Sequence, residues 1–576
     1  GNTNGLRLLN SVGFAGEYSS TLTTNTNVKL AANTAASTVS INSLVLNGFD
    51  ITNPGGAATL TVASASHSGN ILMDSANSIA GSNTTLGITT FETNIHTSSN
   101  STISAVIGTS TTGSLTLSGI GNVTITATTA YTGATNINRA TLTYGASNIL
   151  TSGAVTVGNG TLNIAGNSDT VGAVTLQKGL ITGTSGILTG TSYSFREGTV
   201  SAIIAGAVAV TRVATSTAVD SVVTMTRDNT YTGATTITSG ILKLGAAGGV
   251  TNTPLGTTGG GTTIASGGAL DLNGFTLGTA EAITSLASSG FGASGASNMG
   301  AIMNSSGSAA SYSGALTLTA ASRINADYGA LTISGNASGN FALTFGGFST
   351  ITYSGVRSGT STIVKDGIGV LTLSNGSSSY SGATTISVGT VKIGAASVGG
   401  TNSPLGTTAG ITTVALGARL DLNGFSLGTA EPLTLNGVGH GLGDFASGAL
   451  MNSTGTPVTH TGLITLGSTG VLIKADSGDI NLTNAGTITG ATFALTIGGV
   501  GNGTLSSILG TTTGTLTKIG SGTWTVSGQS TFTGASTIGN GTLKLGASGG
   551  ATNSPLGTTG GATSVMGGAV LDFNGF

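Results

Sequence analysis

The chain has 576 residues, of which 99 are glycine, 6% are charged and none is cysteine. A net charge of −2 without a basic stripe excludes nucleic acid as an expected partner, because phosphate binding needs clustered Lys and Arg. The absence of cysteine excludes disulfides and thiolate metal sites, and no apolar run approaches the roughly 18 residues of a membrane-spanning helix. Plentiful Thr, Val and Ile favour β-structure with many turns over collagen or a disordered chain.

The N-terminal residues 1–130 are predicted to form diverged coils of a repetitive β-fold. Their segment LVLNGFDI at 44–51 resembles LDLNGF, which occurs later in the chain. YTGAT at 131–135 then opens a shortened repeat unit, predicted to span 131–230.

The remaining residues are predicted to hold two full repeat units and the truncated start of a further one: 231–379, 380–531 and 532–576. TNTPLGTT begins at Thr251, and TNSPLGTT begins at Thr401 and Thr552, at intervals of 150 and 151 residues. Sister copies continue beyond the position of Phe576, and the end of a solenoid normally carries a capping repeat. We therefore expect the natural protein to continue past this residue.

Short alternating segments such as TLTLS, TTIT and LKL predict strands, each closed by a glycine turn. Asn273-Gly274, Asn423-Gly424 and Asn574-Gly575 recur at one place and predict tight turns with positive φ. Strands this short bury a face only when coils stack on one another. The predicted fold is all-β: a right-handed parallel β-helix with internal super-repeats of about 150 residues. Coils of roughly 20–25 residues would stack at about 4.8 Å, with Val, Ile, Leu and Ala inside and Thr, Ser and Asn outside.

The segment TLTKIGSGTWTVSGQSTFTGASTIGNGTLKLGA at 515–547 resembles the autotransporter-associated β-strand repeat, or passenger-associated transport repeat. The resemblance is looser at 364–395, lacks the Lys-x-Gly opening at 223–246, and is reduced to YTGAT and a degraded end at 131–146. It implies a β-helical passenger secreted to the surface of a Gram-negative bacterium, with a role in adhesion, matrix or export.

Acidic residues are few and mostly recur with the repeats: Asp271, Asp421 and Asp572; Asp327 and Asp476; Glu281 and Glu431. Equivalent copies in successive units would lie too far apart to form the pair of carboxylates that glycoside hydrolysis needs. We expect them to cap turns or face outward, and we expect the adjacent charges Arg196-Glu197 and Lys365-Asp366 to be solvated. No catalytic residue, no cofactor-binding residue and no cofactor is predicted.

Four histidines are scattered along the chain: His67, His96, His440 and His460. A metal site of His440, His460 and Asp444 is one interpretation, but two stacked surface histidines are favoured, so no metal site is predicted. Trp524 aligns with Leu371 of the preceding unit, which indicates core filling or a surface aromatic rather than a binding platform.

These patterns predict a non-enzymatic, extracellular structural or adhesive protein, a β-helical rod or fibre at the cell surface or in the matrix. Low charge and exposed strand edges favour self-association, and a host or neighbouring cell surface or a polysaccharide is a further candidate partner. One alternative is a monomeric passenger stalk whose adhesive tip lies outside this sequence. Less favoured alternatives are a polysaccharide-acting enzyme and a crystal-surface binder built on Thr-x-Thr ladders.

Overall fold

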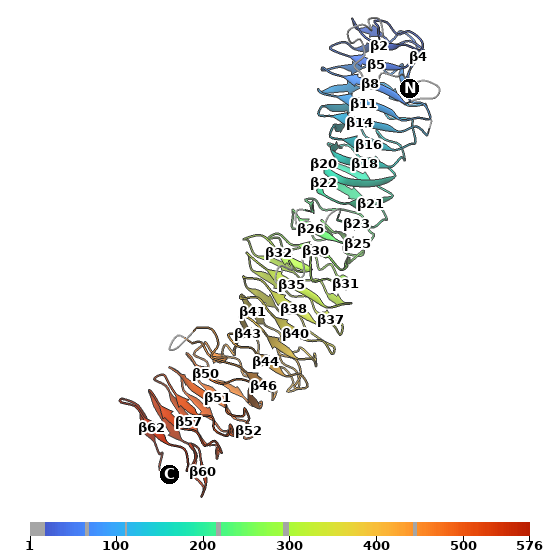
Figure 1. Cartoon of the computed structure of the whole chain (residues 1–576). Coiled ribbons are helices and arrows are strands. Elements are labelled where there is room, and N and C mark those ends of the chain that lie inside the picture. Colours follow the sequence, from blue (N-terminus) through green and yellow to red (C-terminus); the bar gives the residue numbers. More distant parts are fainter. Residues whose placement is uncertain (1–17, 64–67, 110–111, 215–220, 292–298, 442–445) are drawn as a thin grey trace. The chain divides into compact units, whose positions relative to one another are not determined.

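The computed structural model describes residues 18–63, 68–109, 112–214, 221–291, 299–441 and 446–576 (Figure 1). Every regular element in these ranges is a β-strand, and the described residues hold no helix that could cross a membrane. The chain divides into two compact parts, Gly1–Thr263 and Ile264–Phe576, which are described separately. Both are built from stacked coils of a parallel β-solenoid, and the described residues form about 23 turns.

The N-terminal part stacks its strands in three columns, and successive strands of a column belong to successive coils (Figure 1). The first column consists of β2 (Asn27–Lys29), β5 (Ser43–Leu46), β8 (Gly69–Met73), β11 (Thr93–Thr97), β14 (Leu115–Gly119), β16 (Thr135–Asn138), the start of β18 (Val155–Asn163) and of β20 (Ala173–Thr189), β21 (Ser192–Phe195), β23 (Val210–Arg212) and β25 (Thr235–Ile237).

The second column consists of β3 (Thr34–Ala35), β6 (Ile51–Thr52), β9 (Ser78–Ile79), β12 (Ser101–Ile103), β15 (Asn122–Ile125), β17 (Thr141–Tyr144), later residues of β18 and β20, β22 (Gly198–Ala205), β24 (Val222–Met225) and β26 (Gly240–Leu244). The third is short: β4 (Val39–Ile41), β7 (Ala58–Val62), β10 (Thr84–Gly87) and β13 (Val106–Ile107).

The core of this part is filled by buried side chains from the strands of all three columns. In the first column, parallel register aligns the buried side chains of Leu44, Ile71, Ile95, Leu117, Ile137, Val157, Leu176, Phe195 and Arg212. The alternation of side chains along a strand sends these residues inward and the intervening Thr, Ser and Asn outward. Arg212 keeps its place in this column by donating to the carbonyls of Ile241 and Ser221.

The C-terminal part has the same construction. One column consists of β32 (Ile302–Asn304), β35 (Ser322–Ala326), β38 (Leu343–Gly346), β40 (Ile363–Lys365), β42 (Thr384–Ile386), β44 (Thr412–Val414), β46 (Leu433–Leu435) and β49 (Ile464–Leu466). A second consists of β33 (Ala310–Tyr312), β36 (Leu331–Ile333), β39 (Ile351–Tyr353), β41 (Val370–Leu373), β43 (Thr390–Ile393), β45 (Arg419–Asp421), β47 (Leu450–Asn452), β50 (Val471–Ala475), β53 (Leu495–Gly499), β56 (Leu516–Lys518), β58 (Ser536–Ile538) and β62 (Thr563–Val565).

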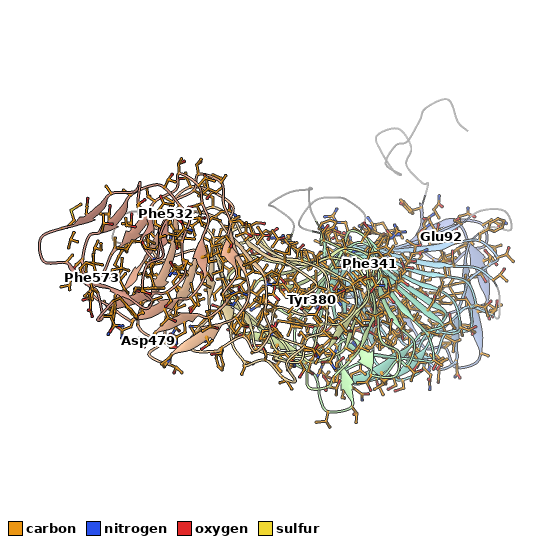
Figure 2. The ribbon with its side chains drawn as sticks, turned by 90° about the horizontal axis from the view of Figure 1, so that it is seen from below. Glu92, Phe341, Tyr380, Asp479, Phe532 and Phe573 are labelled. Atoms are coloured by element: carbon orange, nitrogen blue, oxygen red, sulfur yellow. The ribbon has the colours of Figure 1, made fainter. Side chains whose placement is uncertain are left out.

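A third column lies toward the C-terminus and consists of β48 (Val458–His460), β51 (Ile480–Leu482), β54 (Gly503–Leu505), β57 (Thr523–Val526), β59 (Thr542–Leu545) and β63 (Val570–Asp572). Side chains fill the space that the coils enclose, and Tyr380 and Phe532, both buried, are labelled among them in Figure 2. The predicted all-β parallel solenoid is confirmed. Its handedness, the length of the super-repeat and the unit boundaries stay predictions.

Coil length varies more than the sequence suggested. Ile351, Leu371 and Val391 pair in turn at intervals of 20 residues, whereas Val391, Leu420 and Leu450 pair at intervals of 29 and 30. The longer coils contain the TNSPLGTT and LDLNGF segments. The short coils therefore have the predicted length, and the long ones hold these additional segments, of which Leu405 and Leu422 are buried.

The recurrent Asn-Gly pairs form the predicted turns. Asn273 and Gly274 have φ of 49° and 80°, Asn423 and Gly424 have 50° and 79°, and the pair at 574–575 has 51° and 81°. Only glycine and asparagine adopt this left-handed backbone readily, which explains the choice of residues at each turn.

Candidate binding groove

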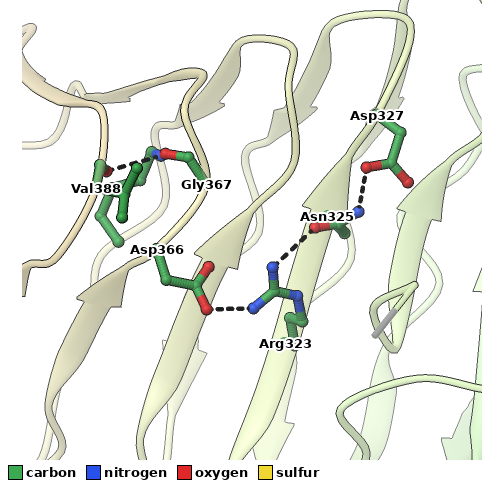
Figure 3. A network of polar contacts seen from close by, with 7 residues as sticks. Arg323, Asn325, Asp327, Asp366, Gly367 and Val388 are labelled. Carbon is green, nitrogen blue, oxygen red and sulfur yellow. Dashed lines mark hydrogen bonds and ion pairs between the residues drawn. The ribbon is translucent and has the colours of Figure 1, made fainter. Parts of the chain in front are cut away.

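A chain of polar contacts crosses the outer face of the C-terminal part (Figure 3). Arg323 in β35 donates from Nη1 to Oδ2 of Asp366 at 2.5 Å and from Nη2 to Oδ1 of Asn325 at 3.2 Å. Asn325 in turn donates from Nδ2 to Oδ1 of Asp327 at 2.7 Å. Strand alternation turns Arg323 and Asn325 away from the core that Ser322, Ile324 and Ala326 face, but the surrounding turns cover them, and they are only 8% and 3% exposed.

Gly346 makes room for the Arg323 guanidinium. It pairs with Asn325 in the adjacent coil, and a Cβ at this position would lie 1.8 Å from Nη2 of Arg323. The guanidinium can therefore lie across the backbone of β38, between Asp366 on one side and Asn325 on the other. The glycine is needed here for space.

Three exposed apolar side chains form a wall beside this polar floor. Tyr328, Phe348 and Ile368 are 75%, 71% and 64% exposed, and they follow β35, β38 and β40 at intervals of 20 residues. The wall and the floor line one cavity of about 700 Å³, together with Met303 and Ser305 of the β32 region. We call this cavity the groove, with Arg323, Asn325, Asp327 and Asp366 as its floor and Tyr328, Phe348 and Ile368 as its wall.

Lys365 lies directly beneath the groove and is 1% exposed. It occupies the inward position of β40, aligned with buried Phe345 of the preceding coil, and its Nζ donates to the carbonyl of Gly367. Burial lowers the pKa of Lys365 to about 8, and the nearby Asp366 opposes this shift. The expectation of a solvated Lys365-Asp366 pair was wrong: Lys365 is in the core because turn carbonyls surround its ammonium, and Asp366 pairs with Arg323.

Burial also shapes the electrostatics of the floor itself. It raises the pKa of Asp327, while the hydrogen bond from Asn325 and the charge of Arg323 act in the opposite direction. Within the described residues, Nε of Arg323 and Oδ1 of Asp366 are buried and have no hydrogen-bond partner. Such atoms carry a desolvation cost, so the floor is a polar site that the fold maintains at some expense in stability.

The following repeat provides an internal comparison, because IKAD at 473–476 and FALTIGG at 493–499 match INAD and FALTFGG of the groove. Leu472 stands at the position of Arg323, Ile519 at that of Asp366, and Val500 at that of Phe348. Both positions of the ion pair therefore carry apolar residues in the following repeat, whereas Asp327 has a counterpart in Asp476. The Arg323–Asp366 pair is specific to the coils of residues 322–368.

The repeat-bound aspartates cap turns, as expected. Oδ1 of Asp271 accepts the backbone N–H of Asn273 at 2.9 Å, and Oδ1 of Asp421 accepts that of Asn423 at the same distance. Oδ2 of Asp421 also accepts the Ser453 hydroxyl at 2.7 Å. The corresponding turn of Asp572 and Asn574 has the first of these bonds, at 2.8 Å. Asp476 is instead paired with Lys474, at 2.9 Å.

Glu281 and Glu431 are buried, so the alternative of an outward carboxylate does not hold for them. Oε1 of Glu431 accepts the Thr412 hydroxyl at 2.7 Å, and burial raises the pKa of Glu431 to about 8. Each lies in the segment where a long coil begins, next to the LGTA sequence. Of the other expected charges, Glu197 pairs with Lys178 at 2.8 Å on the surface.

The histidines do not form the surface pair that was favoured. His440 is exposed, but His460 is buried, and burial lowers its pKa to about 4. His460 takes the β48 position that corresponds to buried Tyr312 of β33, so it fills the core. His96 contacts Ser118 at 3.2 Å, and Asp444 and His67 lie outside the described residues. Among the described side chains, no group of three His, Asp or Glu is placed to hold a metal ion.

Trp524 fills the core, as one of the two sequence interpretations predicted. It is buried, its ring lies over Gly503 of the preceding coil, and its Nε1 donates to the carbonyl of Gly498 at 3.3 Å. Sequence reasoning named Asp327 and Asp366 but did not bring them together, and it missed Arg323, Asn325 and the three residues of the wall. The signal that could have found them is the recurrence of Tyr, Phe and Ile at 20-residue intervals after successive strands.

The segments at 363–393 and 516–545 each contain two neighbouring strand pairs, one coil apart. β40 pairs with β42 and β41 with β43; β56 pairs with β58 and β57 with β59. In each segment a buried lysine, Lys365 or Lys518, donates to carbonyls of the Gly-rich turn that follows it. Tyr380 then donates to or accepts from Thr384 at 2.6 Å across the Tyr-x-Gly-x-Thr turn.

Glycine in that turn permits close stacking of coils. A Cβ on Gly382 would lie 2.1 Å from the carbonyl oxygen of Ser361, and one on Gly534 would lie 2.2 Å from that of Gly514. These segments match the family model described as the passenger-associated-transport-repeat, at residues 221–244, 363–393 and 516–545. No curated protein and no solved structure matches the chain.

Proposed function

Because the chain carries three passenger-associated transport repeats, we propose that its β-solenoid is the passenger part of an autotransporter-type protein and acts outside the cell as a non-enzymatic structural or adhesive rod. The observation that carries this proposal is the place of the repeat in the fold. Each matched segment forms paired strands of successive coils, so the repeat is part of the stacked β-structure of the solenoid itself.

The proposed location can be tested in cells that make the protein. Intact cells would be treated with a protease, labelled with an antibody against the solenoid, and separated from the culture supernatant. We expect cleavage and labelling on intact cells, or recovery from the supernatant, with a cytoplasmic protein as the uncleaved control. Recovery of the protein only after cell lysis would contradict an extracellular role.

We further propose that the rods associate with one another. Large apolar side chains such as Val250, Leu416 and Val500 are exposed on the described surface, and little charge opposes contact between chains. Sedimentation over a hundredfold range of concentration, with electron microscopy of the same samples, tests this. Filaments or bundles support the fibre; a strictly monomeric rod at high concentration supports the alternative, a passenger stalk with its adhesive tip elsewhere.

The absence of enzymatic activity is also part of the proposal. It is supported by the repeat-bound carboxylates: Asp271, Asp421 and Asp572 cap turns, and Asp476 pairs with Lys474. Incubation with a panel of polysaccharides, followed by an assay of reducing ends, tests it directly. Specific release above a heat-denatured control would overturn the non-enzymatic assignment.

A further inference from the structure

We propose that the groove binds one neutral oligosaccharide chain, and that this is how the rod adheres to a carbohydrate surface. The adhesive setting rests on the function proposed above, whereas the binding itself can be tested on the purified chain. The ligand class follows from three properties of the groove: its apolar wall, its polar floor and its balance of charge.

The wall is suited to the apolar faces of sugar rings. Tyr328, Phe348 and Ile368 stand on successive coils, so they repeat along the solenoid at about 4.8 Å, the spacing of adjacent strands. Exposed aromatic rings of this kind are costly in water unless they cover a ligand, and tyrosine combines an apolar face with a polar tip. An elongated ligand that presents apolar patches at short regular intervals would cover all three.

The floor is suited to hydroxyl groups. It presents the partly exposed carboxylates of Asp327 and Asp366 beside the wall, and the buried guanidinium of Arg323 and amide of Asn325 connect and orient them. A sugar hydroxyl can donate to a carboxylate oxygen, so hydroxyls along one oligosaccharide can reach both of these acceptors. Binding pockets commonly have this combination of apolar lining with a few fixed polar groups.

The charges of the groove favour a neutral ligand. Asp327 and Asp366 are balanced by Arg323 and by Lys365 beneath the floor, and Arg323 is in direct contact with Asp366. An anionic sugar would meet the two carboxylates, and a cationic peptide would have to compete with Arg323 for Asp366. An uncharged oligosaccharide is neither repelled by the two carboxylates nor in competition with Arg323 for Asp366.

The ion pair of the floor also distinguishes this repeat, because the following repeat replaces both of its residues. Arg323 and Asp366 lie 43 residues apart, and Leu472 and Ile519 replace both in the following repeat. Gly346 leaves the space that the guanidinium fills. The following repeat forms the same strands with apolar side chains at both positions, so the coils do not need the ion pair in order to fold. Recognition of a ligand is the use of this pair that the geometry supports.

The test is isothermal titration of the full chain with a panel of neutral hexasaccharides of glucose, mannose, galactose and N-acetylglucosamine. Oligogalacturonate and hexalysine serve as the anionic and cationic probes. Three variants are compared with the parent chain: Tyr328→Ala with Phe348→Ala, which removes the wall; Arg323→Leu with Asp366→Ile, which copies the sister repeat; and Val500→Ala, the control at the exposed position matching Phe348.

We expect at least one neutral hexasaccharide to bind, with at least a tenfold loss of affinity in each of the first two variants and less than a twofold change in Val500→Ala. Unchanged amide exchange outside the groove would show that the variants remain folded. The proposal is overturned if none of the neutral hexasaccharides binds, if binding survives both groove variants, or if oligogalacturonate or hexalysine binds more tightly than every neutral probe. Surface exposure on cells would be unaffected by these outcomes, so they leave the proposed function standing.

Discussion

At the scale of single residues, the solenoid tolerates ionisable groups in its core only where the backbone of a turn surrounds them. Nζ of Lys518 donates to the carbonyls of Ile519, Gly520 and Asn540 at 2.9, 2.8 and 3.1 Å. Burial nevertheless lowers the pKa of Lys518 to about 8, so the ammonium is held at a cost. The ammonium of this lysine thus joins carbonyls of its own turn to a carbonyl of the next coil, and we call this arrangement the lysine clamp.

Lys518→Met should weaken this clamp, because three turn carbonyls would lose a charged donor. We expect a loss of about 1–3 kcal/mol in the local stability of β56–β59, measured by amide hydrogen exchange. Lys544→Met is the control, since Lys544 is partly exposed and lies 3.8 Å from Asp572; it should change protection very little. Equal effects of the two substitutions would contradict the clamp.

We predict that the stability of the folded chain depends on pH through Glu431. Its pKa in the folded chain, about 8, is raised above the value of 4.5 for an exposed glutamate, because burial favours the protonated form. The stabilisation from this group is thus complete below pH 4.5 and is lost as the pH rises through 8. Between these limits, melting temperature and local protection around β44 should fall in the parent chain. Glu431→Gln should flatten that fall, whereas Glu197→Gln, at a partly exposed position paired with Lys178, should leave it unchanged.

At the scale of elements, the turn glycines set how closely one coil approaches the next. Gly382 of the Tyr-x-Gly turn has no room for a Cβ, because the carbonyl of Ser361 in the preceding coil occupies that space. Backbone atoms in a ladder cannot move aside as a flexible side chain can. The glycine of the repeat motif is therefore a requirement of stacking.

We expect Gly382→Ala to destabilise the coils of β40–β43 by about 3 kcal/mol, through overpacking against backbone. Gly455→Ala provides a matched control, because no heavy atom would lie within 4 Å of its Cβ. The measurement is hydrogen exchange in β40–β43 for both variants. Similar protection in the two would show that the coils adjust more easily than the geometry indicates.

The sequence predicted the strands, the turns and the parallel solenoid, because alternation and glycine spacing are local signals. The pattern IVK at 363–365 even places Lys365 on the same face as Ile363. We expected the lysine to be solvated on account of its charge, and no local pattern reveals the carbonyls that surround it. The groove was not predictable for a related reason: Arg323 and Asp366 meet only after β38 has passed between them.

At the scale of the whole molecule, the ladder bonds of each described coil join it to the coils on either side of it, and the Arg323–Asp366 pair is a side-chain contact that reaches one coil further. Stability in such a stack is close to a sum of single coils and their interfaces, so damage should remain local. Trp524, which stacks over Gly503 and pairs across to Leu543, is a large buried side chain on which to test this.

Trp524→Ala should cost about 3–5 kcal/mol, and exchange should accelerate in β54, β57 and β59 but not in β5–β14. Trp524→Leu should cost much less, because Leu371 occupies the aligned position of the preceding repeat. Uniform loss of protection along the chain after Trp524→Ala would mean that the solenoid unfolds as one cooperative body.

The parallel register of the coils also determines how the stack would respond to tension. The ladder bonds that join Leu331 to Ile351, and Ile351 to Leu371, run along the direction in which the coils are stacked. A force applied in that direction breaks the hydrogen bonds between two neighbouring coils before it loads the next pair, so the coils separate one after another. Each 20-residue coil would then release roughly 65–70 Å of contour length at a modest force. Such a stack would act as an extensible tether that yields in small steps and dissipates work while its remaining coils stay folded.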